Sequence, residues 1–492
     1  MSLAHKAARG AVWTILSSLG ARAVGVAGTI VMTHLLAPEV IGEVSVAAIV
    51  AMTANWASIW GFGSYAVVKG RGDDAAEVMF HATMAYLVMG VVGLGAVALL
   101  GGHLAGVLDA PGAARFIPGM ALVMFIRRMG GMSERVLMRR MEFRALGLQQ
   151  ALGELAYTVT AVALAVRGWG GDAIIVGNLV QAVVMTSIVM TAAGWRAWAT
   201  PTRLSWARYR DMLRYGLPLC VQSVAHNGSR YWDNLTLAHL FGAGPTGLYN
   251  LAYNLADIPA VQVGEQLAQV LLPSMAALPP ERRPRAFERS TALLSLIIFP
   301  LAVGLGVVAT PLIAVALDDQ WQGVAPLLTI LAALSVFRPV TWVIGAYLEA
   351  QDRTGLLMRL ELAKVIVLIG GMFALAPLGL HATAGAVGVA FGLTAIGGVW
   401  MVSKEGPRPL VLVRGFLQPL AACGVMVGAV LLVRLALGDA APLLHLVVEI
   451  LVGAAAYVGA AWILCRATAR DLLELLRGAL RGRRSAATEA SP

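Results

Sequence analysis

The sequence predicts an all-α polytopic membrane protein with about 14 transmembrane helices, and three observations support this fold class. Of its 492 residues, 59% are hydrophobic and 13% are charged, whereas soluble proteins average about 45–50% apolar and about 25% charged residues. The mean hydropathy is +0.76, and the apolar runs are longer than the ~18 residues that indicate a membrane-spanning helix. The alternation of apolar and polar residues that barrel strands require is weak, which favours helices over a β-barrel.

Fourteen apolar spans follow one another along the chain. They are residues 11–36, 40–66, 78–100, 114–137, 147–167, 172–194, 214–240, 248–276, 290–316, 324–350, 355–378, 383–402, 411–437 and 443–465. The connections between them are short, so we expect no soluble domain. After the last span, residues 466–492 form a basic tail that begins with the pattern of an amphipathic helix on the inner leaflet.

The basic residues lie mainly on alternate connections. Twenty-eight of the 37 lysines and arginines fall on one side of the spans, and the opposite connections carry only Arg115 and Arg167. The positive-inside rule therefore predicts that both termini are cytoplasmic. The net charge of +10 follows from this topology, and we expect no nucleic-acid partner.

An internal repeat relates two segments that each connect the first two spans of a half. Residues 33–47 align without gaps with residues 238–252, and the matched pairs are His34 with His239, Leu35 with Leu240, Gly42 with Gly247 and Ala47 with Ala252. Six spans separate the copies, so both copies insert the same way up. This predicts two six-helix lobes, residues 1–205 and 206–405, around a substrate path. Two additional helices (406–465) and the tail (466–492) lie outside the repeat.

The stretch from Ser229 to Gly247 places charge inside the seventh span. Arg230 precedes the turn at Gly242 by about ten residues, or ~15 Å at helical rise, which places it near the middle of a bilayer. Membranes tolerate such a charge only where it faces a partner or a water-filled cavity. Asp233 lies three residues further on and can pair with Arg230, so a structural clamp and a functional site both remain open.

Other basic residues also lie inside spans and are candidates to bind an anionic group. With Arg230, they are Arg22, Arg127, Arg128, Arg338 and Lys364. Arg22 has no acid within one helical turn. Because adjacent helical residues point about 100° apart, we expect only one of Arg127 and Arg128 to face a cavity.

Three of the in-span cations have local features that bear on their role. Arg338 precedes Pro339, which kinks a helix and makes this site a plausible moving part. Lys364 follows Glu361 by three residues and can pair with it on one helix face. Arg434 lies near the outer end of its span, where a long side chain can reach the interface, so we expect it to serve no site.

Acidic residues inside the spans are candidates for ion pairs or for coupling to a cation gradient. They include Glu154, Asp233, Asp257 and Glu265, and their spacing does not choose among them. The first lobe has more in-span cations than acids and the second has fewer. If the protein binds an anion, we therefore expect the first lobe to make the main contact.

Four residues offer the surface that a sugar ring prefers, which combines apolar faces with amides. These sugar-contact candidates are Asn55, Trp56, Trp60 and Trp232. Membrane tryptophans more often serve as packing or interface anchors, so both interpretations stay open.

Signatures of enzymes are missing from the sequence. It contains no P-loop and no zinc-spaced cluster of histidine and cysteine, and Cys220, Cys423 and Cys465 are scattered within apolar spans. We expect a protein that is not an enzyme and that uses no metal or other cofactor.

Six short motifs then carry a family resemblance over about residues 8–405. They are residues 35–42 (LLAPEVIG), 137–144 (LMRRMEFR), 233–242 (DNLTLAHLFG), 247–253 (GLYNLAY), 272–275 (LPSM) and 321–328 (WQGVAPLL). In this order they resemble the polysaccharide-transporter (Wzx-type) branch of the multidrug/oligosaccharidyl-lipid/polysaccharide (MOP) flippase superfamily.

The resemblance implies a flippase that moves undecaprenyl-diphosphate-linked oligosaccharide across the bacterial inner membrane by alternating access. The product would be O-antigen, capsule or exopolysaccharide, and a polysaccharide polymerase with its chain-length machinery would be possible partners. Two alternatives are a drug/cation antiporter of the same superfamily and a membrane-integral polymerase or glycosyltransferase. The surplus of in-span arginines argues against the first alternative, and the missing extramembrane domain argues against the second.

Overall fold

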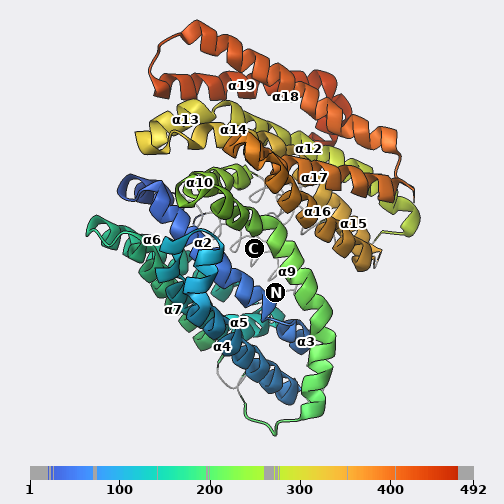
Figure 1. The fold of residues 1–492 in the computed structure, drawn as a ribbon. Coiled ribbons are helices and arrows are strands. Elements are labelled where there is room, and N and C mark those ends of the chain that lie inside the picture. The colour runs from blue at the N-terminus through green and yellow to red at the C-terminus, as the bar shows by residue number, and fades with distance from the viewer. Residues whose placement is uncertain are drawn as a thin grey trace, which may run out of the picture. The chain divides into compact units, whose positions relative to one another are not determined.

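The computed structural model describes residues 20, 24–25, 27–69, 75–140, 142–194, 198, 200–259, 271, 275, 278–351, 353–404 and 406–474. The chain divides into two compact units, Met1–Asn250 and Leu251–Pro492. Within the described residues all regular elements are helices (Figure 1). Nine of these described helices are long and apolar enough to cross a membrane. The all-α polytopic class is confirmed, while the number fourteen stays a prediction.

The first unit contains helices from the blue and green part of the chain (Figure 1). They are α2 (Pro38–Ala57), α3 (Phe62–Lys69), α4 (Ala75–Val107), α5 (Ile117–Arg139), α6 (Phe143–Val166), α7 (Gly171–Ala193), α9 (Trp206–Phe241) and the start of α10 (Ala243–Pro259). Helix α7 packs along both α5 and α6, and α2 packs along α9. The unit ends at Asn250, whereas the predicted first lobe ends at residue 205. The lobe boundary rests on the internal repeat and stays a prediction.

The predicted span 40–66 is not one continuous helix. Helix α2 ends at Ala57 and α3 begins at Phe62, and between them Trp60 and Gly61 take left-handed backbone conformations with φ of 47° and 61°. A non-glycine residue pays about 1–2 kcal/mol for that conformation. The break could not be predicted from the continuous apolar sequence, because hydropathy carries no information about backbone dihedral angles.

The two glycines matched by the internal repeat, Gly42 and Gly247, pack against each other's segments. A methyl group added to Gly42 would overlap the carbonyl oxygen of Ala243, and one added to Gly247 would overlap the carbonyl oxygen of Pro38. Pro38 and Ala243 are themselves separated by the spacing of the repeat. The contact is therefore reciprocal, as a twofold relation between the two segments would produce.

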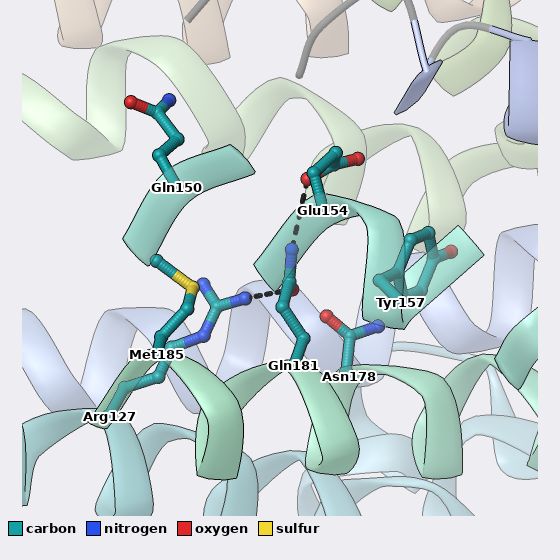
Figure 2. A pocket seen from close by; sticks show the side chains of 7 residues that line it. All are labelled: Arg127, Gln150, Glu154, Tyr157, Asn178, Gln181 and Met185. Carbon is teal, nitrogen blue, oxygen red and sulfur yellow. Dashed lines mark hydrogen bonds between the residues drawn. The ribbon is translucent and has the colours of Figure 1, made fainter. Parts of the chain in front are cut away.

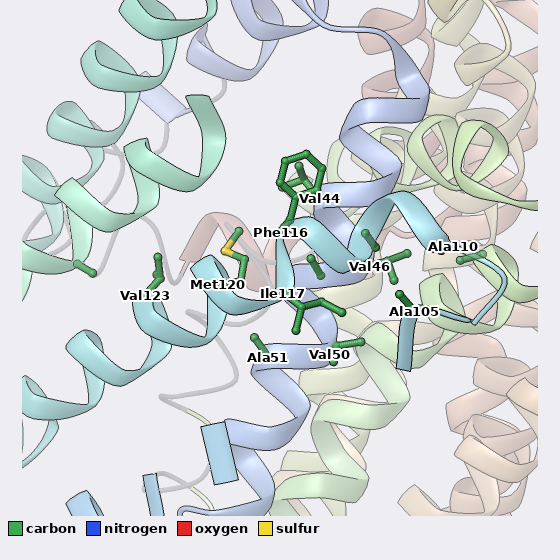
Figure 3. Packing of buried hydrophobic residues seen from close by; sticks show 14 residues of the cluster. Val44, Val46, Val50, Ala51, Ala105, Ala110, Phe116, Ile117, Met120 and Val123 are labelled. Carbon is green, nitrogen blue, oxygen red and sulfur yellow. The ribbon is translucent and has the colours of Figure 1, made fainter. Parts of the chain in front are cut away.

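A buried apolar cluster in the first unit joins α2 to the start of α5 (Figure 3). Val44, Val50 and Ala51 of α2 pack against Phe116 and the start of α5. Half of the buried residues in this cluster are alanines. Small side chains let helix backbones approach closely, and such packing holds helices together in lipid, where no hydrophobic driving force acts between them. This packing fixes α2 and α5, two of the helices that carry the candidate residues described below.

The second unit contains the rest of α10 and a set of long apolar helices. They are α12 (Arg283–Val307), α13 (Ala309–Ala316), α14 (Val324–Leu334), α15 (Arg338–Ala350), α16 (Thr354–Leu375), α17 (Leu380–Ser403), α18 (Pro409–Leu437) and α19 (Pro442–Leu464). The predicted span 324–350 is interrupted by a 3₁₀ turn at Ser335–Phe337, and α15 starts at Arg338 with Pro339 in its first turn. The sequence predicts a kink beside Pro339, and the structure has a short 3₁₀ interruption just before that residue.

The last two long helices, α18 and α19, pack along one another and against α12. Their outward positions are apolar and exposed, with Leu435 and Ile463 about four-fifths exposed, as expected of surfaces that meet lipid. Residues 466–474 continue as helix, and Arg289 of α12 pairs with Asp471 at 2.8 Å. The start of the basic tail therefore packs on the second unit.

Candidate functional site

A polar pocket lies between α5, α6 and α7 of the first unit (Figure 2). Its volume is about 360 Å³, at the small end of the range for ligand sites. Its lining consists of Arg127, Gln150, Glu154, Tyr157, Asn178, Gln181 and Met185. Arg127, Glu154 and Gln181 each lie near the middle of a helix of 23 or 24 residues. The pocket therefore places polar groups near the middle of three predicted spans.

Arg127 is held in this pocket through a neutral amide. Its guanidinium donates to the side-chain oxygen of Gln181, and the amide nitrogen of Gln181 donates to Glu154 at 2.9 Å. The Nε–H of Arg127 is buried and has no partner among the described residues. An arginine bound in this way retains donor capacity for a further acceptor, and a guanidinium fits the oxygens of a phosphate.

Arg128, the next residue, points elsewhere. It is 2% exposed, and its two terminal nitrogens donate at 2.7 Å to the hydroxyl and the carbonyl oxygen of Ser58. Its guanidinium also stacks over the ring of Tyr86 at 4.3 Å. Only Arg127 of the pair lines the pocket, so the expectation that the two side chains diverge is confirmed.

The described part of the first predicted span passes close to the pocket. A methyl group added to Gly25 would overlap the Glu154 carboxylate, and one added to Gly28 would crowd Thr158. These glycines let the first span approach α6. Arg22 lies outside the described residues.

Asp233 belongs to a buried polar cluster where α9 meets α10. The hydroxyl of Tyr249 donates to its carboxylate at 2.6 Å, and the backbone N–H of Asn234 donates to it at 2.8 Å. Asn250 donates to the side chain of Asn234 at 3.1 Å. Arg230 lies one turn earlier on α9, with its guanidinium 5.9 Å from the ring of Tyr231. In these contacts, Arg230 and Asp233 therefore have different partners.

The candidate cations of the second unit are paired with carboxylates. Arg338 forms an ion pair with Asp257, and Lys364 lies 2.7 Å from Glu361 on its own helix. Both cations also lie about 5 Å from the ring of Phe391. The local pairing expected for Lys364 is confirmed. Glu265 lies outside the described residues.

The expectation that Arg434 only reaches toward the interface is wrong. Its guanidinium donates twice to Glu449, at 2.6 and 2.9 Å, and once to the carbonyl oxygen of Val307 at 2.7 Å. Glu449 is fully buried, and a buried carboxylate requires a partner. The pairing escaped sequence analysis because the two residues lie on different helices, α18 and α19.

The tryptophans predicted to contact sugar gather where α2 meets α9. The rings of Trp56 and Tyr231 are 5.4 Å apart with an interplanar angle of 33°. The indole N–H of Trp232 donates to Thr53 at 3.1 Å, and that of Trp60 donates to the carbonyl oxygen of Ala57 at 2.8 Å. Asn55 precedes Trp56, and its side-chain oxygen has no hydrogen-bond partner among the described residues.

Several residues of these sites were missed by sequence analysis. Gln181, Tyr231 and Ser58 are uncharged, so a search for in-span charges passed over them. An amide in an apolar span is a usable signal, because hydrocarbon offers it no partner. Tyr231 could have been found from its place between Arg230 and Trp232.

The fold defines a class, that of polytopic helical membrane proteins, and the pocket places polar groups near the middle of three of the helices. Over 94% of this chain and 100% of the other, the structure is similar to the lipid II flippase MurJ in an inward closed conformation, with a TM-score of 0.78 and 12% sequence identity. A likeness at this identity establishes the fold.

The family follows from the sequence comparisons. The family model described as "Polysaccharide biosynthesis protein" matches residues 31–326, more than half of the chain. The chain belongs to this family, and with it to the polysaccharide-transporter branch of the MOP flippase superfamily.

Two curated relatives cover much of the chain. The chain is 25% identical over 409 residues to the lipopolysaccharide biosynthesis protein WzxC of Escherichia coli (strain K12), covering 80% of this chain and 79% of that protein. It is 26% identical over 323 residues to the succinoglycan biosynthesis transport protein ExoT of Rhizobium meliloti (strain 1021), covering 65% and 64%.

Proposed function

We propose that this protein is a flippase that moves an undecaprenyl-diphosphate-linked oligosaccharide from the inner to the outer leaflet of the bacterial inner membrane, with both termini in the cytoplasm. The oligosaccharide is a repeat unit of O-antigen, capsule or exopolysaccharide. The printed names of WzxC and ExoT connect such proteins with lipopolysaccharide biosynthesis and with succinoglycan transport. In this proposal the chain carries its lipid by alternating access and performs no covalent chemistry.

The observation that carries the proposal is the state of Arg127. Burying an arginine in the middle of a membrane costs at least about 2.5–3.5 kcal/mol, and a direct carboxylate partner would offset that cost. Arg127 instead donates to the neutral amide of Gln181, and no carboxylate contacts it directly among the described residues. A cation held this way favours an anionic ligand such as a diphosphate, which the guanidinium can bind through two parallel hydrogen bonds.

The drug/cation antiporter is disfavoured by the same observation. A cationic substrate requires a site with net negative charge, yet the lining of the pocket offsets its one carboxylate, Glu154, with the guanidinium of Arg127. Glu154 reaches Arg127 through Gln181, so it moderates the positive charge without removing the free donor.

A deletion strain tests the function. Loss of the chain should abolish surface polysaccharide and cause undecaprenyl-linked repeat units to accumulate in the inner leaflet, measured by lipid extraction and mass spectrometry. Plasmid-borne wild-type protein should restore both, and so should Arg167→Gln, which changes an exposed arginine at the end of α6. Normal polysaccharide combined with increased sensitivity to cationic drugs would instead support the antiporter.

A further inference from the structure

An aromatic surface in the first unit lies beside Arg230, and none of its residues lines the pocket of Arg127. It consists of Trp56 on α2 with Tyr231 and Trp232 on α9, and all three side chains are partly exposed. The rings of Trp56 and Tyr231 lie 5.4 Å apart, and the hydrogen bond from Trp232 to Thr53 fixes the third ring. The aromatic surface, meaning these three residues, is thus preformed by contacts between two helices.

Arg230 lies at the edge of the aromatic surface. Its guanidinium carbon is 5.9 Å from the centre of the Tyr231 ring, within the range in which a cation and an aromatic ring attract each other. A cation next to aromatic ring faces matches one particular part of the cargo. That part is the sugar that carries the diphosphate, because it joins an anion directly to a ring with an apolar face.

We propose that the aromatic surface is the subsite for the sugar joined to the diphosphate, with Arg230 on the diphosphate side. This inference rests on the proposed function and names the part of its substrate that this surface binds. Ligand sites commonly combine aromatic side chains with a few placed polar groups.

Arg128 acts as a positioning residue for this subsite. Its two bonds to Ser58 hold the residue that directly follows α2, where the helix has no further N–H groups to satisfy its carbonyls. Trp60 stands in a left-handed conformation two residues later, and the backbone of Gly216 on α9 packs closely against its carbonyl oxygen. Arg128 therefore fixes the end of α2 that carries Trp56, without touching the lipid itself.

The test compares two lipids on the purified full chain in nanodiscs, with binding measured by native mass spectrometry. One probe is undecaprenyl diphosphate without sugar, and the other is the same lipid carrying the oligosaccharide. Trp56→Leu and Tyr231→Leu should each weaken binding of the glycosylated lipid about fivefold to tenfold, the size of an aromatic contact, and leave the bare lipid unchanged. Trp462→Leu, an exposed tryptophan on α19, should change neither.

The outcomes of this experiment test the sugar subsite separately from the proposed flippase function. Equal losses for both lipids, or a loss for neither, would overturn the subsite. Wild-type protein that binds neither lipid would overturn the proposed function instead. Arg128→Met should reduce binding of the glycosylated lipid alone, Arg128→Lys should restore part of it, and the double variant Arg128→Met/Trp56→Leu should lose no more than Trp56→Leu. Additive losses in that double variant, or an equal loss of the bare lipid, would refute the positioning role.

Discussion

Two arginines of α5 in the first unit and three in-span cations of the second unit are held in different ways. In the second unit, Arg338, Lys364 and Arg434 each contact a carboxylate, namely Asp257, Glu361 and Glu449. In the first unit, Arg127 and Arg128 of α5 are held by an amide, a hydroxyl, a carbonyl and an aromatic ring. Presence of an in-span arginine is therefore a poor guide to function, and the chemistry of its partner is a better one.

The difference has a direct electrostatic consequence. A paired carboxylate cancels the charge of a cation at short range, and the pair then interacts weakly with a ligand. Neutral partners satisfy hydrogen bonds and leave the positive charge in place, where the low dielectric of the membrane strengthens its effect. The sequence-based expectation that the first half makes the main anion contact is consistent with this comparison, and it stays a prediction until binding is measured.

The largest effect is expected from breaking a pair in the second unit. Asp257→Asn leaves Arg338, which is 8% exposed, without its counter-charge, and unpaired buried charges cost about 3–5 kcal/mol. We expect a large drop in the thermal unfolding temperature of the detergent-purified protein. The double variant Asp257→Asn/Arg338→Gln should recover most of the lost unfolding temperature and should export polysaccharide. A double variant that is stable but does not export would show that Arg338 takes part in binding the substrate.

A somewhat smaller loss should follow from Arg434→Met. Glu449 is then left buried with His445 at 3.3 Å as its remaining described partner, and the cost should be ~3 kcal/mol, at the low end of the range because Arg434 is one-third exposed. Arg434→Met/Glu449→Leu should restore the unfolding temperature. If the single change leaves that temperature unaltered, the pair does not anchor α18 to α19.

The fold class could be predicted from the sequence because it depends on composition and on the length of apolar runs. The break between α2 and α3 could not, because it depends on backbone angles at Trp60 and Gly61 inside an uninterrupted apolar run. An irregularity next to Pro339 could, because proline cannot continue the hydrogen-bond ladder, although the sequence predicts a kink and the structure has a 3₁₀ turn at Ser335–Phe337.

For the candidate site, too, some features could be predicted from the sequence and others could not. Arg127 was identified from its position inside a span, whereas its partner Gln181 is more than fifty residues away on α7. The pairs Arg338 with Asp257 and Arg434 with Glu449 also join different helices, and one sequence contains no record of which helix faces lie together. The pair of Lys364 and Glu361 was recognised because both residues lie on one helix face.

The first unit should depend on close packing where the second depends on ion pairs. Gly42→Ala and Gly247→Ala each place a methyl group against a backbone carbonyl, and overpacking of this kind costs about 1–3 kcal/mol. Thermal unfolding should show similar losses for both, because the contact is reciprocal. Gly95→Ala is the control, since a methyl group there meets nothing within 4 Å, and a loss as large as that at Gly42 would show that helix glycines are sensitive in general.

The smallest effect on stability should come from Arg127→Gln, and this variant tests the comparison most directly. Glutamine is two bonds shorter than arginine and gives up the bond to Gln181, but no carboxylate loses a direct partner, so the unfolding free energy should change by only ~1 kcal/mol. Export of polysaccharide should nevertheless fall at least about tenfold, because a charge-assisted bond to a diphosphate is worth ~1.5–3 kcal/mol. The double variant Arg127→Gln/Glu154→Gln removes both charges of the pocket and should not restore export, in contrast to the double variant at Asp257 and Arg338. If export returns when both pocket charges are removed, Arg127 and Glu154 are an ion pair bridged by an amide, and the two units hold their cations for the same structural reason.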